Sequence, residues 1–234
     1  MIKILNNIMA SHSFTLVDIE CVDDAFPFSL YKAQSIRREE YFLTLEIKVP
    51  DDKVLQHFLD DKAQEIFEEI QKSEKVERYF EKNCTMLICL EFINPDRDLV
   101  LALEEDPYNF KKNVITYSST ELAALNNYIS DNAIQTFDSE VVNAILNSNS
   151  GKDFLDFKKQ ENTQNPLYNL VIRTILKLPF IVYRPQEQKL ENLSLQINKS
   201  LPPNLTETLT KILAYDWADE LVLTHIESIW CEKA

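Results

Sequence analysis

Residues 41–49 read YFLTLEIKV, and this stretch decides the fold. Leu43, Leu45, Ile47 and Val49 alternate with Phe42, Thr44, Glu46 and Lys48, the period of a β-strand. Asp51, after Pro50, can cap a following helix. That helix has its apolar residues at helical spacing: Val54, Leu55, Phe58, Leu59, Ala63, Ile66, Phe67 and Ile70. The pattern therefore predicts a strand followed directly by an amphipathic helix whose apolar stripe packs in the core.

Three further segments of the N-terminal half have strand character. Residues 14–20 alternate, and the continuous apolar run Thr85–Phe92 ends before Asn94-Pro95 and is typical of a central strand. Residues 98–104 are interpreted as another strand. Strands around one helix predict an α+β fold with a mixed sheet on which a helix packs.

From about Ser118 the patterns become helical. Ser119 can cap one helix, Asp138 or Ser139 a second, and Leu167–Leu178 is an apolar helix stopped by Pro179. Residues 147–152 are interpreted as a linker or exposed loop, and residues 180–184 as a short strand or an extended segment. One long C-terminal helix is predicted from Asn204 or Thr206 onward.

The predicted organisation is thus a sheet-containing part, residues 1–117, followed by a mainly helical part, residues 118–234. The two parts are separate domains or one continuous domain. No signal-peptide pattern follows Met1–Leu5, and no apolar run approaches the roughly 18 residues of a membrane span. A cytoplasmic protein is expected.

Cysteine usage favours the same compartment. Cys84 and Cys89 lie in one predicted strand, on opposite faces, while Cys21 and Cys231 are far away in sequence. The chain has no CxxC pair, and its three histidines share no ligand spacing with the cysteines. We therefore expect buried free thiols in a reducing compartment, with no metal and no cofactor.

The glycine content and the net charge restrict the possible functions of the chain. The chain has one glycine, Gly151, where usage of about 7% predicts about sixteen. Phosphate-binding loops, dinucleotide fingerprints and nucleophile elbows need several glycines because the chain must turn tightly there. The net charge of −14 also opposes independent binding of nucleic acid.

One constellation resembles a metal-dependent nuclease site. Glu46 and Lys48 lie two residues apart on a strand, with Asp18, Asp23 and Asp24 upstream. A carboxylate pair with a lysine can hold Mg²⁺ and orient water. The alternative is a solvated strand face with a Glu–Lys pair, which the charge of the chain favours. Glu104, Glu105 and Asp106 are likewise interpreted as a solvated acidic turn instead of a metal site.

The segment 104–117, EEDPYNFKKNVITY, combines acids, aromatics and lysines in a pattern that fits neither a simple strand nor a simple helix. Rigid aromatic anchors flanked by charges are typical of a docking surface. The alternative is that Tyr108 and Phe110 pack in the core. The candidate partner-binding residues are Glu104, Glu105, Asp106, Tyr108, Phe110, Lys111, Lys112 and Tyr117.

At this segment the chain resembles the middle component of ABC-three-component systems, whose members include the small subunit of Lamassu-type anti-phage defence. The resemblance rests on EEDPYNFKK (104–112) with Tyr117, PLYNL (166–170) and LKLPF (176–180). It implies a non-catalytic adaptor that joins an SMC-like ATPase, which senses DNA, to an effector such as a nuclease.

Two other functions stay open at this point. One is a small metal-dependent nuclease that uses Glu46 and Lys48, and the other is an acidic regulator that mimics DNA. Neighbouring genes for an ATPase and an effector would favour the adaptor.

Overall fold

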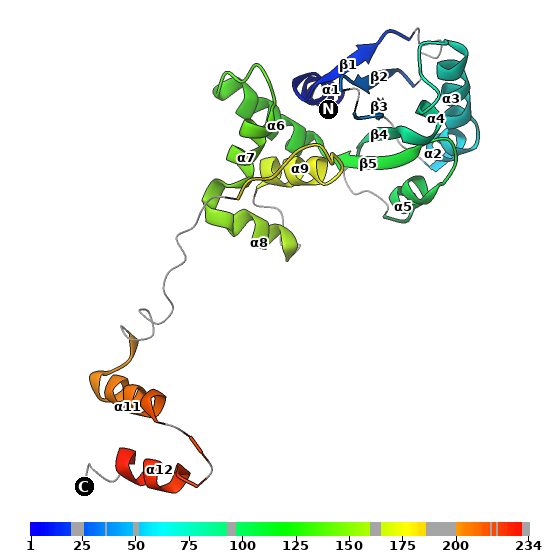
Figure 1. The fold of residues 1–234 in the computed structure, drawn as a ribbon. Coiled ribbons are helices and arrows are strands. Elements are labelled where there is room, and N and C mark those ends of the chain that lie inside the picture. The colour runs from blue at the N-terminus through cyan, green and yellow to red at the C-terminus, as the bar shows by residue number, and fades with distance from the viewer. Residues whose placement is uncertain are drawn as a thin grey trace. The chain divides into compact units, whose positions relative to one another are not determined.

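The chain forms two compact units, residues 1–185 and 186–234. The computed structural model describes residues 1–19, 26–35, 37–48, 52–92, 97–159, 165–185, 200–215, 217–218 and 220–230. The first unit holds the sheet and most of the helices (Figure 1). Among the described residues, every helix falls short of the length and apolarity that a membrane crossing requires.

A five-stranded mixed sheet is the centre of the first unit. Its strands lie in chain order: β1 (Phe14–Val17), β2 (Phe28–Ala33), β3 (Tyr41–Ile47), β4 (Cys84–Glu91) and β5 (Lys111–Tyr117). β1, β2 and β3 pair antiparallel, whereas β3, β4 and β5 pair parallel. The predicted strands at 14–20, 41–49 and 85–92 are confirmed as β1, β3 and β4, and so is the α+β class. β2, β5 and the N-terminal helix are not among the predicted elements; for residues 111–117 the expectation that no simple strand forms is wrong.

Helices connect the parallel strands. Between β3 and β4 lie α2 (Asp52–His57), the π-helical turn η1 (Phe58–Lys62), α3 (Ala63–Lys72) and α4 (Phe80–Asn83). The predicted stripe is confirmed, because Leu55, Phe58, Ala63, Ile66 and Ile70 are all buried. Asp51, the predicted cap, lies outside the described residues.

The prediction of a strand at residues 98–104 is wrong, because this segment is helix α5 (Arg97–Glu105). Leu103 is buried, and Leu99 and Val100 pack partly against the same core. Their spacing of three and four residues is helical, not alternating. Tertiary topology also requires a crossover here, since parallel strands such as β4 and β5 cannot be joined by a short hairpin.

Both faces of the sheet are covered (Figure 1). α2 to α5 pack on the face that carries Leu43, Leu45, Met86, Ile88 and Val114. The opposite face lies under α1 (Ile2–Ser11), α6 (Ser119–Asp131), α7 (Ser139–Leu146) and α9 (Pro166–Ile175). Cys84 and Cys89 are buried free thiols in the two different clusters, which confirms their predicted opposite faces.

Of the two caps predicted after β5, one is at the predicted position and the other is shifted by one residue. Ser118, not Ser119, caps α6 in a capping box with Glu121, and Asp138 caps α7. Because α6, α7 and α9 share one hydrophobic cluster with β3, β4 and β5, the predicted parts 1–117 and 118–234 are in direct contact within residues 1–185. The first unit therefore has cores on both sides of one sheet.

The predicted loop 147–152 contains a short 3-10 turn, Ser148–Gly151, followed by α8 (Lys152–Lys158). Gly151 has φ +84°, in the left-handed region that glycine tolerates best. Residues 180–184 are predicted to form a short strand or an extended segment. Residue 180 lies in a turn and residues 181–184 form neither helix nor strand, so the short-strand alternative is wrong.

The prediction of one long C-terminal helix is wrong. Among the described residues of the second unit, two helices are seen, α11 (Pro203–Ala214) and α12 (Val222–Trp230). Tyr215 is extended at the end of α11, and its ring stacks on His225 at 4.3 Å between centroids. The Tyr215 hydroxyl also lies 3.1 Å from Ser228 Oγ. A continuous helix could not make these contacts, because it would separate the residues along its axis.

We predict that Phe110→Ala lowers the free energy of unfolding by about 3–5 kcal/mol, because a buried aromatic side chain leaves a cavity. Phe110 is 3% exposed and packs edge-to-face against Phe67 and Phe80. The matched control is Tyr108→Ala, which should change stability by less than about 0.5 kcal/mol because Tyr108 is 71% exposed. Denaturant titration measures both, and equal effects would contradict the placement of the two rings.

Candidate docking site

The segment between α5 and β5 folds around a buried lysine. Lys112 is 1% exposed, and its ammonium group forms an ion pair with Asp106. The same nitrogen donates to the carbonyl oxygen of Tyr108 at 2.7 Å and of Phe110 at 3.5 Å. A buried charge needs such partners, since an unpaired one costs several kcal/mol. Lys112 thus fixes the turn from inside and does not face solvent.

The structure separates the eight candidate partner-binding residues into three groups. Phe110, Lys112 and Tyr117 are buried. Glu104 and Asp106 are half-buried and engaged in internal bonds, whereas Glu105, Tyr108 and Lys111 are exposed. A partner can therefore reach Glu105, Tyr108 and Lys111 directly, while the others support the shape of the segment.

Glu104 closes the outer edge of β5. Its Oε1 accepts from the backbone N–H of Val114 at 2.7 Å and from Nζ of Lys177 at 2.6 Å. Nδ2 of Asn113 donates to the carbonyl oxygen of Lys177 at 3.2 Å. An open edge offers unpaired backbone groups to other chains, so these bonds protect β5 from unwanted pairing. They also tie the segment 176–180 to the segment 104–117.

Glu46 is engaged on the face of the sheet that α1 covers. Its Oε1 accepts from the Tyr117 hydroxyl at 2.8 Å and from the amino group of Met1 at 3.1 Å. Burial raises the pKa of Glu46, but these hydrogen bonds outweigh it and leave the pKa below its ordinary value. Burial and the neighbouring Glu46 carboxylate raise the pKa of Tyr117 above its ordinary value.

The other residues of the nuclease hypothesis do not join Glu46. Lys48 is exposed at the end of β3, and Asp18 is exposed and lies 3.8 Å from Nζ of Lys75. Asp23 and Asp24 lie outside the described residues. Within the described ranges, no three His, Cys, Asp or Glu residues are placed to hold a metal ion.

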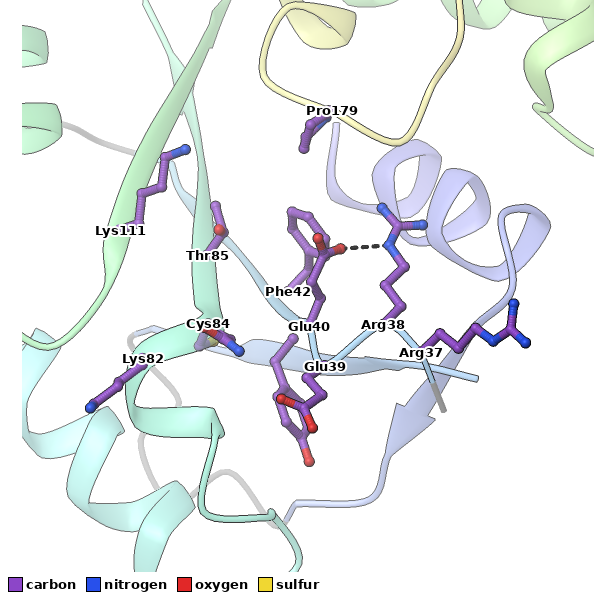
Figure 2. A pocket seen from close by; sticks show the side chains of 12 residues that line it. Arg37, Arg38, Glu39, Glu40, Phe42, Lys82, Cys84, Thr85, Lys111 and Pro179 are labelled. Atoms are coloured by element: carbon purple, nitrogen blue, oxygen red, sulfur yellow. Dashed lines mark hydrogen bonds and ion pairs between the residues drawn. The ribbon is translucent and has the colours of Figure 1, made fainter. Parts of the chain in front are cut away.

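A groove opens where the parallel strands begin. It has a volume of about 510 Å³ and lies at the first residues of β3, β4 and β5 (Figure 2). Its lining residues come from the β2–β3 connection, the first residues of β3, β4 and β5, the helix α4 and the segment after α9. They are Arg37, Arg38, Glu39, Glu40, Tyr41, Phe42, Lys82, Asn83, Cys84, Thr85, Lys111 and Pro179. We call it the basic groove.

The basic groove carries four cationic side chains and two carboxylates, whereas the chain has a net charge of −14. Arg38 is held in place: its Nε donates to Glu40 Oε2 at 2.7 Å, and its guanidinium lies 5.1 Å from the ring centroid of Phe14. In the parts of the chain that the structure describes, Lys82 and Lys111 form no ion pair. The groove is thus a local cationic site on an anionic protein.

Sequence reasoning singled out Lys111 but missed Arg37, Arg38 and Lys82. The adjacent arginines before a strand are a weak signal, because arginine pairs are frequent on any surface. Their proximity to Lys82 and Lys111 depends on the parallel pairing, which brings the starts of β3, β4 and β5 to one edge.

Comparison with known families gives a match to part of the chain. The family model of the ABC-three component (ABC-3C) system Middle Component 1 matches residues 40–140, fewer than half of the 234 residues. The matched range includes β3, β4, β5 and the segment 104–117. No curated protein and no solved structure matches the chain. The match supports the resemblance to a middle component of an ABC-three-component system.

We predict that in Glu46→Gln the free energy of unfolding falls less steeply than in wild type as the pH is lowered. Because the folded pKa of Glu46 is lowered, its contribution to stability is complete above the unfolded pKa and is lost as pH falls through the folded pKa. The variant should be less stable by about 1–2 kcal/mol at pH 7, since a charge-assisted hydrogen bond becomes a neutral one. Denaturant titration from about pH 7 down to about pH 3 measures this.

The control for this prediction is Glu105→Gln, which removes an equal charge from an exposed position. It should leave the pH dependence nearly unchanged. Parallel pH curves for wild type and Glu46→Gln would contradict the placement of Glu46 under α1.

Proposed function

We propose that the chain is a non-catalytic middle component of an ABC-three-component system of the Lamassu type, which acts in the cytoplasm in anti-phage defence. In this role it bridges an SMC-like ATPase that senses DNA and an effector nuclease. The observation that carries the proposal is the family match over residues 40–140. The name of that family describes one component of a multi-subunit system, so protein partners follow from it.

Two properties of the chain support an adaptor over an enzyme. One glycine is too few for the phosphate-binding and nucleophile-presenting loops described above. The carboxylate of Glu46, which a metal-dependent nuclease would need, instead accepts hydrogen bonds from Tyr117 and Met1. Its Oε1 therefore joins the sheet to α1.

The net charge supports an indirect relation to DNA. A protein with a charge of −14 is repelled by phosphates at long range, so contact with DNA falls to a partner subunit.

The direct test is assembly. The chain should co-purify with both the SMC-like ATPase and the effector of the same system, and omission of the chain should leave these two proteins apart. Co-expression with one affinity tag, followed by size-exclusion chromatography, measures this. A complex of ATPase and effector that forms equally well without the chain would contradict the bridging role.

We also predict that the isolated chain shows no nuclease turnover and binds duplex DNA weakly. At physiological salt we expect no gel shift at nanomolar protein, because non-specific binding that relies on phosphate contacts needs cationic side chains in excess. Cleavage of DNA that disappears in Glu46→Ala would instead favour the nuclease. A gel shift with a steep salt dependence would contradict the charge argument.

A further inference from the structure

We propose that the basic groove binds an acidic, extended segment of a protein partner, with carboxylates of that segment paired to Lys111 and Arg38. The inference rests on the proposed function as an adaptor, and it names the place and the chemistry of one contact.

The first argument is the arrangement of the two cations. Lys111 begins β5, and Arg38 precedes β3, so the parallel sheet sets the position of both. In Figure 2 they stand on opposite sides of Phe42 and Thr85, with Pro179 above the space between them. A carboxylate that enters this space meets Lys111 on one side and, on the other, Arg38, whose Nε is already bonded to the Glu40 carboxylate, while Arg37 points outward. The groove thus converges on an anionic group.

The second argument is that Arg38 is already ordered. Its guanidinium lies 5.1 Å from the ring centroid of Phe14 and 5.6 Å from that of Phe180, and Nε is bonded to Glu40. Among the described residues, none accepts a hydrogen bond from its two terminal nitrogens. These nitrogens can bind a carboxylate, and little side-chain entropy is lost because the arginine is already fixed.

The third argument selects a peptide over a nucleic acid. A duplex carries one charge per about 1.7 Å and needs a continuous cationic track, but Glu39 and Glu40 interrupt the lining. The net charge of −14 repels a long polyanion, whereas a short segment with a few carboxylates mainly senses charges within about one Debye length, about 8 Å. The exposed side chain of Pro179 adds an apolar part to the lining, which suits amino-acid side chains.

The size of the groove agrees with such a ligand. About 510 Å³ falls in the range of pockets that hold small ligands, about 300–1,000 Å³. Asn83 and Thr85 add polar side chains to the lining. A few side chains of an extended segment fill this space, so the contact is local and depends on a small number of ion pairs.

The test uses the full chain and a fluorescein-labelled peptide in which glutamates alternate with leucines. Fluorescence anisotropy should show binding that weakens as salt is added. Lys111→Glu should weaken binding by at least about tenfold, because it replaces an attraction with a repulsion. Arg38→Ala should weaken binding as well. The melting temperature of this variant shows whether the lost contacts with Phe14 and Phe180 destabilise the chain.

Matched controls isolate the groove. Lys158→Glu makes the same charge change at an exposed position of α8, and it should leave the affinity unchanged. A peptide with glutamine in place of glutamate should not bind. Inorganic phosphate and a single-stranded oligothymidylate serve as competitors, and neither should displace the peptide at equal concentration.

Several results would overturn the inference. They are absence of binding at about 1 mM peptide, an equal loss of affinity in Lys158→Glu and Lys111→Glu, and tighter, Lys111-dependent binding of oligothymidylate or phosphate. The last result would make the groove a phosphate site. The assembly test separates this inference from the proposed function. If the complex assembles but the chain binds no acidic peptide, the adaptor role is supported and the groove does not bind an acidic segment.

Discussion

The parallel pairing of β3, β4 and β5 is the constraint on which the rest of the first unit depends. Parallel neighbours need crossover connections, so the chain must leave the sheet after each strand and return along one face. α2 to α4 form the first crossover and α5 the second. The remaining face is then left for α1, α6, α7 and α9, which gives the sheet a core on each side.

The same pairing explains how much of the fold the sequence predicts. β3, β4 and the α2–α3 helix are recognisable because alternation, a continuous apolar run and a helical stripe are local patterns. α5 is not, since the five consecutive apolar residues 99–103 fit a short buried strand as well as a helix. What decides between them is the parallel register of β5 on β4, a contact between distant segments that local patterns do not contain.

The candidate site shows a similar limit. The composition of residues 104–112 and the resemblance predict a docking segment there, but they do not predict which of its side chains face solvent. Lys111 and Lys112 are adjacent lysines, yet Lys111 is exposed and Lys112 is buried, with 1% of its surface exposed. Arg38 and Lys82 have no distinguishing local pattern, and they join Lys111 in the groove through the strand order alone.

The contrast between Lys111 and Lys112 follows from the strand period. Successive residues of a strand point to opposite sides, so a lysine buried against Asp106 requires its predecessor to point away. Glu104 and Lys177 neutralise each other at the edge of the same strand. Most charges of the segment 104–112 are therefore used to shape the protein itself. The charge of Lys111 is left exposed, at the position where the starts of three parallel strands meet.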